Sequence, residues 1–166
     1  MQSDKFTALV RNAIGAAQSA ALAADHQKLT AEHVLAALLK DDNMTVKMLL
    51  AKAGADSASL SALLKAGLDK FPQVTGSGAG QLQLDADLAR IFAAVEAEAK
   101  ARHDQFIAVD LLLLGMTKST GSVGKILKKA GVEPAPLGAA IDEMRKGRTA
   151  DSDAAEDSYD ALSRYT

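Results

Sequence analysis

The chain has 166 residues and no cysteine, so it can bury a core as one domain or two small ones, while a disulfide framework and a thiolate zinc site are excluded. Its formal net charge of -2 arises from Lys+Arg 19 and Asp+Glu 21 mixed along the sequence, which leaves no basic surface for nucleic acid. No apolar run approaches the roughly 20 residues that cross a bilayer, and no export signal is recognisable, so we expect a cytoplasmic protein without nucleic-acid or membrane partners.

The first half of the chain predicts four helices, in keeping with abundant alanine and leucine and an aromatic content of only 4%. Thr30 can start the second helix, because its side-chain oxygen can accept an otherwise unpaired backbone N–H. Gly54 ends the third, because glycine readily takes the left-handed conformation past a helix end. The predicted helices cover 7–24, 30 to about 41, 45–53, and 57 or 59 to 68.

A glycine-rich stretch at 75–80 separates the two halves, and it cannot hold a helix because glycine loses too much backbone freedom there. The helical pattern starts again at Asp85, a candidate N-cap. Pro134 and Pro136 open the last helix, since proline is tolerated in a first turn. The helices predicted in this half cover 85–95, 111–116, 123–130 and 134–147.

The two halves repeat each other at a constant shift of 77 residues without a gap. The shift pairs Ile14 with Ile91, Ala17 with Ala94, His26 with His103, Leu35 with Leu112, Val46 with Val123 and Gly54 with Gly131. We therefore predict an all-α fold of eight helices, a pseudo-two-fold tandem repeat of two four-helix units. The predicted organisation is repeat one at 1–72, a linker at 73–83, repeat two at 84–148 and a flexible linker at 149–166.

A search for catalytic motifs favours a chain that binds over one that catalyses. The stretch 76–80 lacks the lysine and the preceding strand of a phosphate-binding loop. His26 and His103 lie in equivalent loops of opposite repeats, and His33 stands at a helix start where an imidazole most often packs locally, so a shared metal site is not favoured. No nucleophile elbow occurs. We expect no catalytic residue, metal or cofactor in this chain; a small hydrolase or metal enzyme on a helical scaffold is the alternative.

Several stretches resemble the Clp amino-terminal repeat domain, over residues 6–147, and in detail the ClpB type of that family. The matching stretches are Lys5-Phe6-Thr7, Leu29-Thr30-Ala31-Glu32-His33-Val34-Leu35 and Phe71-Pro72-Gln73-Val74 in the first half, and Asp104-Gln105-Phe106-Ile107-Ala108-Val109-Asp110-Leu111 and Ile126-Leu127-Lys128-Lys129-Ala130-Gly131 in the second. The end of the chain, 155–166, is similar to the segment that joins this domain to the first ATPase module of ClpB-type disaggregases.

The resemblance implies a non-catalytic domain that binds unfolded or aggregated polypeptide in an apolar groove and passes it to a hexameric AAA+ ring working with the DnaK chaperone system. ATP and magnesium are then expected only in AAA+ modules outside this chain. The family's positions for substrate binding map onto Thr7, Asp104 and Asp110, with apolar groove residues at Ile91, Phe92 and Leu111. The family usually has Glu where this chain has Asp110, which keeps the charge with a shorter reach.

These candidate residues also have structural explanations. Thr7 suits a helix N-cap, and Asp104 and Asp110 lie near a helix start, where the dipole favours a carboxylate. Phe92 and Leu111 suit a core as well as a groove. The run 111–114 puts leucine on every side of a short helix, so we expect part of it to be exposed. The runner-up within the family is the ClpA or ClpC type, which docks an adaptor and serves a protease; the end of the chain argues against it.

Overall fold

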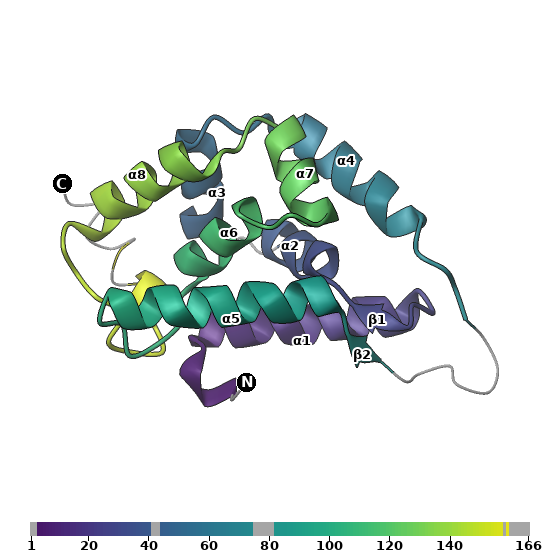
Figure 1. The fold of residues 1–166 in the computed structure, drawn as a ribbon, viewed down its shortest axis with the longest axis horizontal. Helices are drawn as coiled ribbons and strands as arrows, with labels where there is room; N and C mark the ends of the chain where they lie inside the picture. The colour runs from purple at the N-terminus through teal and green to yellow at the C-terminus, as the bar shows by residue number, and fades with distance from the viewer. Residues whose placement is uncertain (1–2, 41–43, 75–81, 158, 160–166) are drawn as a thin grey trace.

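The computed structural model describes residues 3–40, 44–74, 82–157 and 159. Within these ranges it contains eight α-helices, and they confirm the all-α prediction (Figure 1). No helix in the described ranges is long and apolar enough to cross a membrane. In chain order the elements are η1 (Ser3–Lys5), α1 (Ala8–Ala23), β1 (Lys28–Leu29), α2 (Ala31–Lys40), α3 (Met44–Lys52), α4 (Ser57–Asp69), β2 (Gln83–Leu84), α5 (Ala86–Ala101), α6 (Val109–Thr117), α7 (Ser122–Lys129) and α8 (Pro134–Arg145).

The helix ends follow from capping side chains and two glycines. Thr7 and Asp85 each accept a backbone N–H of the helix that follows, so α1 and α5 begin where the sequence predicts. The N-cap of α4 is Asp56, one residue before the earlier of the two predicted starts, 57 and 59. Gly54 and Gly131 both have φ of 92° just after α3 and α7, a left-handed conformation that glycine adopts without strain.

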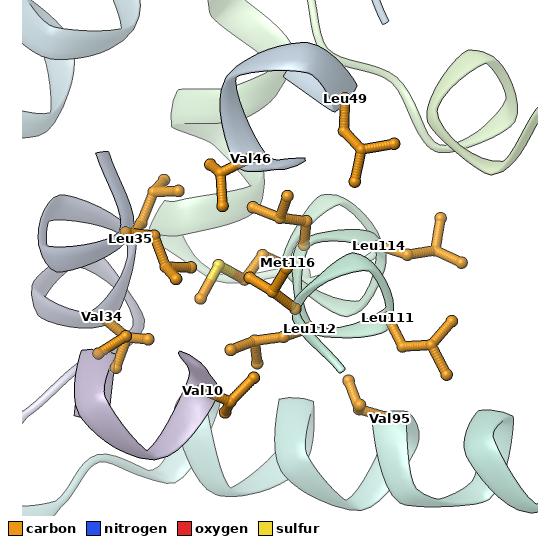
Figure 2. Packing of buried hydrophobic residues seen from close by; sticks show 14 of the residues in the cluster. Val10, Val34, Leu35, Val46, Leu49, Val95, Leu111, Leu112, Leu114 and Met116 are labelled. Atoms are coloured by element: carbon orange, nitrogen blue, oxygen red, sulfur yellow. The ribbon is translucent and has the colours of Figure 1, made fainter. Parts of the chain in front are cut away.

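The short helix α6 runs through the middle of the hydrophobic core. Figure 2 shows its side chains among residues of α1, α2, α3 and α5. Helices α3, α5, α7 and α8 pack against α6. Neighbours on several sides bury the run 111–114 completely, with exposed fractions of 1%, 0%, 1% and 5%. The expectation that part of this leucine run is exposed is therefore wrong.

The repeat has a change of register that the constant shift of 77 misses. At that shift, buried Ala17 would pair with exposed Ala94. The burial pattern of the first two helices of each repeat instead matches at a shift of 78 residues, the distance from Val10 to Leu88 (88 − 10 = 78). It pairs Val10 with Leu88, Ala13 with Ile91, Ala17 with Val95 and Ala21 with Ala99. The last two helices match at 77, which pairs Val46 with Val123, Leu49 with Ile126, Leu60 with Leu137 and Leu64 with Ile141.

A two-residue parallel sheet joins the two repeats. Lys28 of β1 pairs with Gln83 of β2, and Leu29 pairs with Leu84. The predicted linker at 73–83 therefore reaches into a strand at its last residue. Most of that linker, 75–81, lies outside the described residues.

Residues 149–157 and Tyr159 differ from the predicted flexible linker, because they pack on the domain. The backbone N–H of Ala8 donates to the carbonyl of Asp153 at 2.8 Å, and the N–H groups of Gln105 and Phe106 both donate to the carbonyl of Ala150 at 2.9 Å. Ala150, Ala155 and Tyr159 are buried. We call residues 150–159, excepting 158, the docked segment; residues 158 and 160–166 lie outside the described part of the chain.

Candidate functional site

Arg145, in the last turn of α8, binds two of the predicted site residues. Its Nε donates to Asp110 Oδ2 at 2.6 Å and its Nη2 to Asp110 Oδ1 at 2.9 Å. Its Nη1 lies 2.9 Å from both carboxylate oxygens of Asp104. The three side chains are almost completely buried. Burial is the largest single effect and lowers the pKa of Arg145, but the hydrogen bonds with Asp110 and the nearby negative charges together outweigh it and raise the pKa above its ordinary value.

Backbone geometry brings the two carboxylates to Arg145. Asp104 follows the turn at the end of α5, where His103 has a left-handed φ of 64°, and its Oδ1 also accepts the N–H of Ala150. Asp110 is the second residue of α6, and its Oδ1 accepts the N–H of Leu111 at 2.8 Å. The aspartate at position 110 is thus long enough to reach Arg145.

Thr7 joins the same region through Glu156 of the docked segment. The hydroxyl of Thr7 donates to Glu156 Oε2 at 2.6 Å, and the N–H of Val109 donates to the same oxygen at 2.9 Å. One carboxylate therefore links the N-terminal ends of α1 and α6, where helix dipoles favour a negative charge. Burial raises the pKa of Glu156, and the hydrogen bonds from Thr7 and Val109 only partly oppose this rise.

Tyr159 completes the docked segment. Its ring lies 5.3 Å from the guanidinium carbon of Arg145 and 5.0 Å from that of Arg148, within range of cation–π attraction. The side chain is buried, yet its hydroxyl oxygen has no hydrogen-bond partner among the described residues. Burial raises the pKa of Tyr159 above its ordinary value, although the charge of Arg145 opposes this.

The structure brings the polar trio Thr7, Asp104 and Asp110 together and places the three apolar candidates below the surface. Ile91, Phe92 and Leu111 have exposed fractions of 3%, 7% and 1%. The ring of Phe92 lies 5.5 Å from that of Phe6, in the hydrophobic core cluster. These three side chains thus line no open groove in this arrangement, and their predicted contact with substrate stays a prediction.

Three residues of the site were missed by sequence reasoning: Arg145, Glu156 and Tyr159. Arg145 lies 41 residues from Asp104 and 35 residues from Asp110 along the chain, so no local pattern pairs them. Two carboxylates that are buried close together do, however, need a neighbouring positive charge, because an unpaired buried charge is strongly destabilising. The stretch 155–157 carries apolar and acidic residues together, and this was the available signal for a docked rather than a solvated segment.

The histidines form a separate buried cluster without His103. His33 Nε2 lies 2.8 Å from His26 Nδ1, and His33 Nδ1 accepts the N–H of Thr30 at 3.1 Å. Burial, and secondarily the charge of His26, lower the pKa of His33 to about 4. Within the described residues no group of three or more His, Cys, Asp or Glu side chains could hold a metal ion.

Comparison with known proteins shows to which family this chain belongs. The family model of the Clp repeat (R) N-terminal domain matches residues 5–147. The chaperone protein ClpB of Rhodopseudomonas palustris is 42% identical over 166 residues, and that of Rickettsia felis is 33% identical over 165. Each alignment covers 99% of this chain and 19% of the relative, so the chain spans about a fifth of the length of these relatives.

Solved structures confirm the fold. The N-terminal domain of Hsp104 from Candida albicans superimposes with a TM-score of 0.79 at 20% identity, covering 92% of this chain and 99% of that one. The N-terminal domain of the caseinolytic protease associated chaperone ClpD from Arabidopsis thaliana has a TM-score of 0.58 at 20% identity, covering 82% of this chain and 94% of that one. Both similarities, at this identity, concern the fold alone.

Proposed function

Because this chain belongs to the Clp repeat N-terminal domain family, we propose that it is the client-binding domain of a ClpB-type disaggregase. In this proposal it captures unfolded or aggregated polypeptide in the cytoplasm and passes it to a hexameric AAA+ ring, which cooperates with the DnaK chaperone system. ATP and magnesium bind to the AAA+ modules, and the domain itself binds its clients without catalysing a reaction.

The observation that supports this proposal is that the domain already holds a stretch of polypeptide. Backbone N–H groups of Ala8, Gln105 and Phe106 donate to main-chain carbonyls of the docked segment. These hydrogen bonds are made to the main chain of the bound segment and not to its side chains, so they suit clients of many sequences. We call the surface formed by these amides together with Thr7, Asp104 and Asp110 the docking face.

A client reaches the docking face only when the docked segment leaves it. Glu156 and Ala150 then release the hydroxyl of Thr7, the N–H of Val109 and one oxygen of Asp104, which become available to a client. Three backbone amides and a few side chains make a small surface, and ordering the client costs conformational entropy. We expect affinities in the micromolar range or weaker, strengthened by the multiple copies in a hexamer.

An NMR titration of backbone amides with reduced, permanently unfolded casein tests this proposal. Shifts are expected at Ala8, Gln105, Phe106 and Val109. Glu156→Ala removes an anchor of the docked segment and is expected to strengthen casein binding, because the client then competes with a weaker internal occupant. Asp157→Ala changes the neighbouring exposed carboxylate and serves as the matched control.

Four outcomes contradict the proposed function. Casein shifts confined to other helices place the client elsewhere. Equal casein affinity in Glu156→Ala and Asp157→Ala shows that the docked segment does not compete. Tight binding of a ClpS-like adaptor supports the ClpA or ClpC type instead, and stoichiometric zinc or iron in the purified chain supports a metal enzyme.

A further inference from the structure

The two repeats place one helix pair at each end of the molecule, and these pairs can be compared position by position. α3 packs with α8, and α7 packs with α4 (Figure 1). The matched burial of these helices at 77 residues makes α4 equivalent to α8 and α7 equivalent to α3. A difference between the two pairs is therefore a difference in side chains on the same framework.

Helix α8 packs on α3, and two neighbouring residues near its C-terminal end can be compared with their equivalents in α4. Met144 on α8 is buried, with an exposed fraction of 4%. Next to it in sequence, Glu143 accepts a hydrogen bond from Lys52 Nζ of α3 at 3.4 Å. In α8 a buried, unbranched apolar side chain thus stands next to a carboxylate that pairs with α3.

The equivalent junction between α4 and α7 lacks both side chains. Gly67 stands at the position of Met144 (144 − 77 = 67), and Ala66 stands at that of Glu143 (143 − 77 = 66). Both residues line a groove of about 330 Å³, which Leu63 and Ile126 also line. A Cβ atom at Gly67 would approach Ile126 Cδ1 to 3.3 Å, closer than ordinary van der Waals contact, so Ile126 packs against the backbone of Gly67 and forms the wall of the groove there.

The rim of this groove carries positive charge. Lys129 is the equivalent of Lys52 (129 − 77 = 52), but Ala66 offers it no carboxylate. Lys70 and Lys125 also line the groove, and within the described residues no acidic side chain pairs with any of the three lysines. The groove's own carboxylate, Glu32, is buried and accepts the hydroxyl of Ser122 at 3.0 Å.

We propose that the α4–α7 groove binds a helical segment of a partner protein that carries a carboxylate beside an apolar side chain without a branch at Cβ, such as methionine or leucine. The apolar side chain takes the place that Met144 fills in the other repeat, and the carboxylate pairs with Lys129 as Glu143 pairs with Lys52. The acidic docked segment of this chain is held elsewhere, by Thr7 and Arg145, so this segment does not occupy the groove. This inference does not depend on client capture at the docking face.

A helix-stabilised peptide with methionine and leucine on one face, flanked by glutamates, is a suitable probe. We expect amide shifts in α4 and α7 on titration. Lys129→Ala is expected to weaken binding about two- to fivefold, the effect of one exposed ion pair. Lys128→Ala, an exposed lysine of α7 outside the groove, is the matched control and should bind like the unsubstituted chain.

A variant that restores a carboxylate in the α4–α7 groove provides a second, independent test of the proposal. Ala66→Glu restores the carboxylate of the other repeat, and since Ala66 is exposed, the fold tolerates it. We expect it to weaken the acidic peptide about tenfold or more, because it neutralises Lys129 and repels the peptide's glutamates. Unfolding midpoints of all variants verify that the fold is kept.

The proposal is overturned by any result of three kinds. The first is no peptide shift in α4 and α7. The second is equal binding by a peptide in which glutamine replaces glutamate, or equal losses in Lys129→Ala and Lys128→Ala. The third is sedimentation showing dimers that Lys129→Ala dissociates, since the groove would then be an interface between copies of this chain.

Discussion

Glu32 and Asp110 occupy the same position in the two repeats, as the second residues of α2 and α6, and both are buried. Their partners differ. Asp110 forms two hydrogen bonds with the guanidinium of Arg145, whereas Glu32 accepts hydrogen bonds from the hydroxyls of Ser122 and Thr30. In repeat two, the carboxylate at this backbone position is paired with a cation. In repeat one, the equivalent carboxylate forms no ion pair within the part of the chain that the structure describes.

Removing the carboxylate of Asp110 should strongly destabilise the domain. Asp110→Ala leaves the buried Arg145 with Asp104 alone, and breaking a buried ion pair on one side typically costs about 3–5 kcal/mol. Asp142→Ala removes the exposed partner of Arg102 and should cost less than about 1 kcal/mol. Urea unfolding followed by circular dichroism measures both. Comparable losses in the two variants would show that the buried pair contributes no more than a surface pair.

Glu32→Gln should have the opposite effect at neutral pH. Burial raises the pKa of Glu32 above its ordinary value, against the opposing hydrogen bond from Ser122. The folded state then holds this proton more tightly than the unfolded state, so its contribution to stability is present below the ordinary pKa and is lost as pH rises through the raised one. Glutamine keeps a hydrogen-bonding group without the charge.

The measurement is the free energy of unfolding of Glu32→Gln and of the unsubstituted chain between pH 4 and pH 8, values that bracket the carboxyl titration. The difference between the two should grow in favour of the glutamine variant as pH rises. A difference that is constant with pH, or that favours glutamate at neutral pH, would show that Glu32 is stably charged in the fold.

His33 predicts a pH dependence of the opposite sign. Its Nδ1 accepts the N–H of Thr30, so a proton added there would face another donor. Burial and the charge of His26 lower the pKa of His33 to about 4, from 6.5. The unfolded state binds this proton more tightly, so stability is lost as pH falls from about 6.5 through about 4. NMR titration of the His33 ring should give a midpoint near 4; a midpoint above 6 would contradict the buried, neutral ring.

The helices were predictable from sequence because each rests on local information. Thr7, Asp85, Gly54 and Gly131 act at the helix ends where their chemistry indicates. The register between repeats was not predictable in this way, since the shift changes between the second and third helices of the repeat, near Met44. A one-residue difference in a loop leaves the helical periodicity on each side intact and is revealed only by which residues are buried.

The site was predictable only in part, because long-range contacts decide it. Resemblance pointed to Thr7, Asp104 and Asp110, but nothing local shows that Arg145 joins two of them. The docked segment has a composition typical of solvated chain, rich in aspartate, alanine and serine. It packs nonetheless, because its carbonyls accept backbone N–H groups of the domain and Glu156 bridges two helix starts.

Tyr159→Phe should strengthen the docked segment. The hydroxyl of Tyr159 is buried and has no hydrogen-bond partner among the described residues, so docking removes it from water without compensation. An unsatisfied buried polar group costs about 1–3 kcal/mol, whereas the phenylalanine ring keeps the contacts with Arg145 and Arg148. Tyr159→Ala removes the ring and should release the segment.

Hydrogen exchange of the Val109 amide measures this docking, because that amide donates to Glu156 of the segment. Exchange should slow in Tyr159→Phe and accelerate in Tyr159→Ala. Casein affinity should move in parallel, weaker in the first variant and stronger in the second, because the segment and the client compete for the docking face. Faster exchange in Tyr159→Phe would mean that the hydroxyl has a partner that holds the segment down, and the competition would then depend on a polar contact and not on the ring.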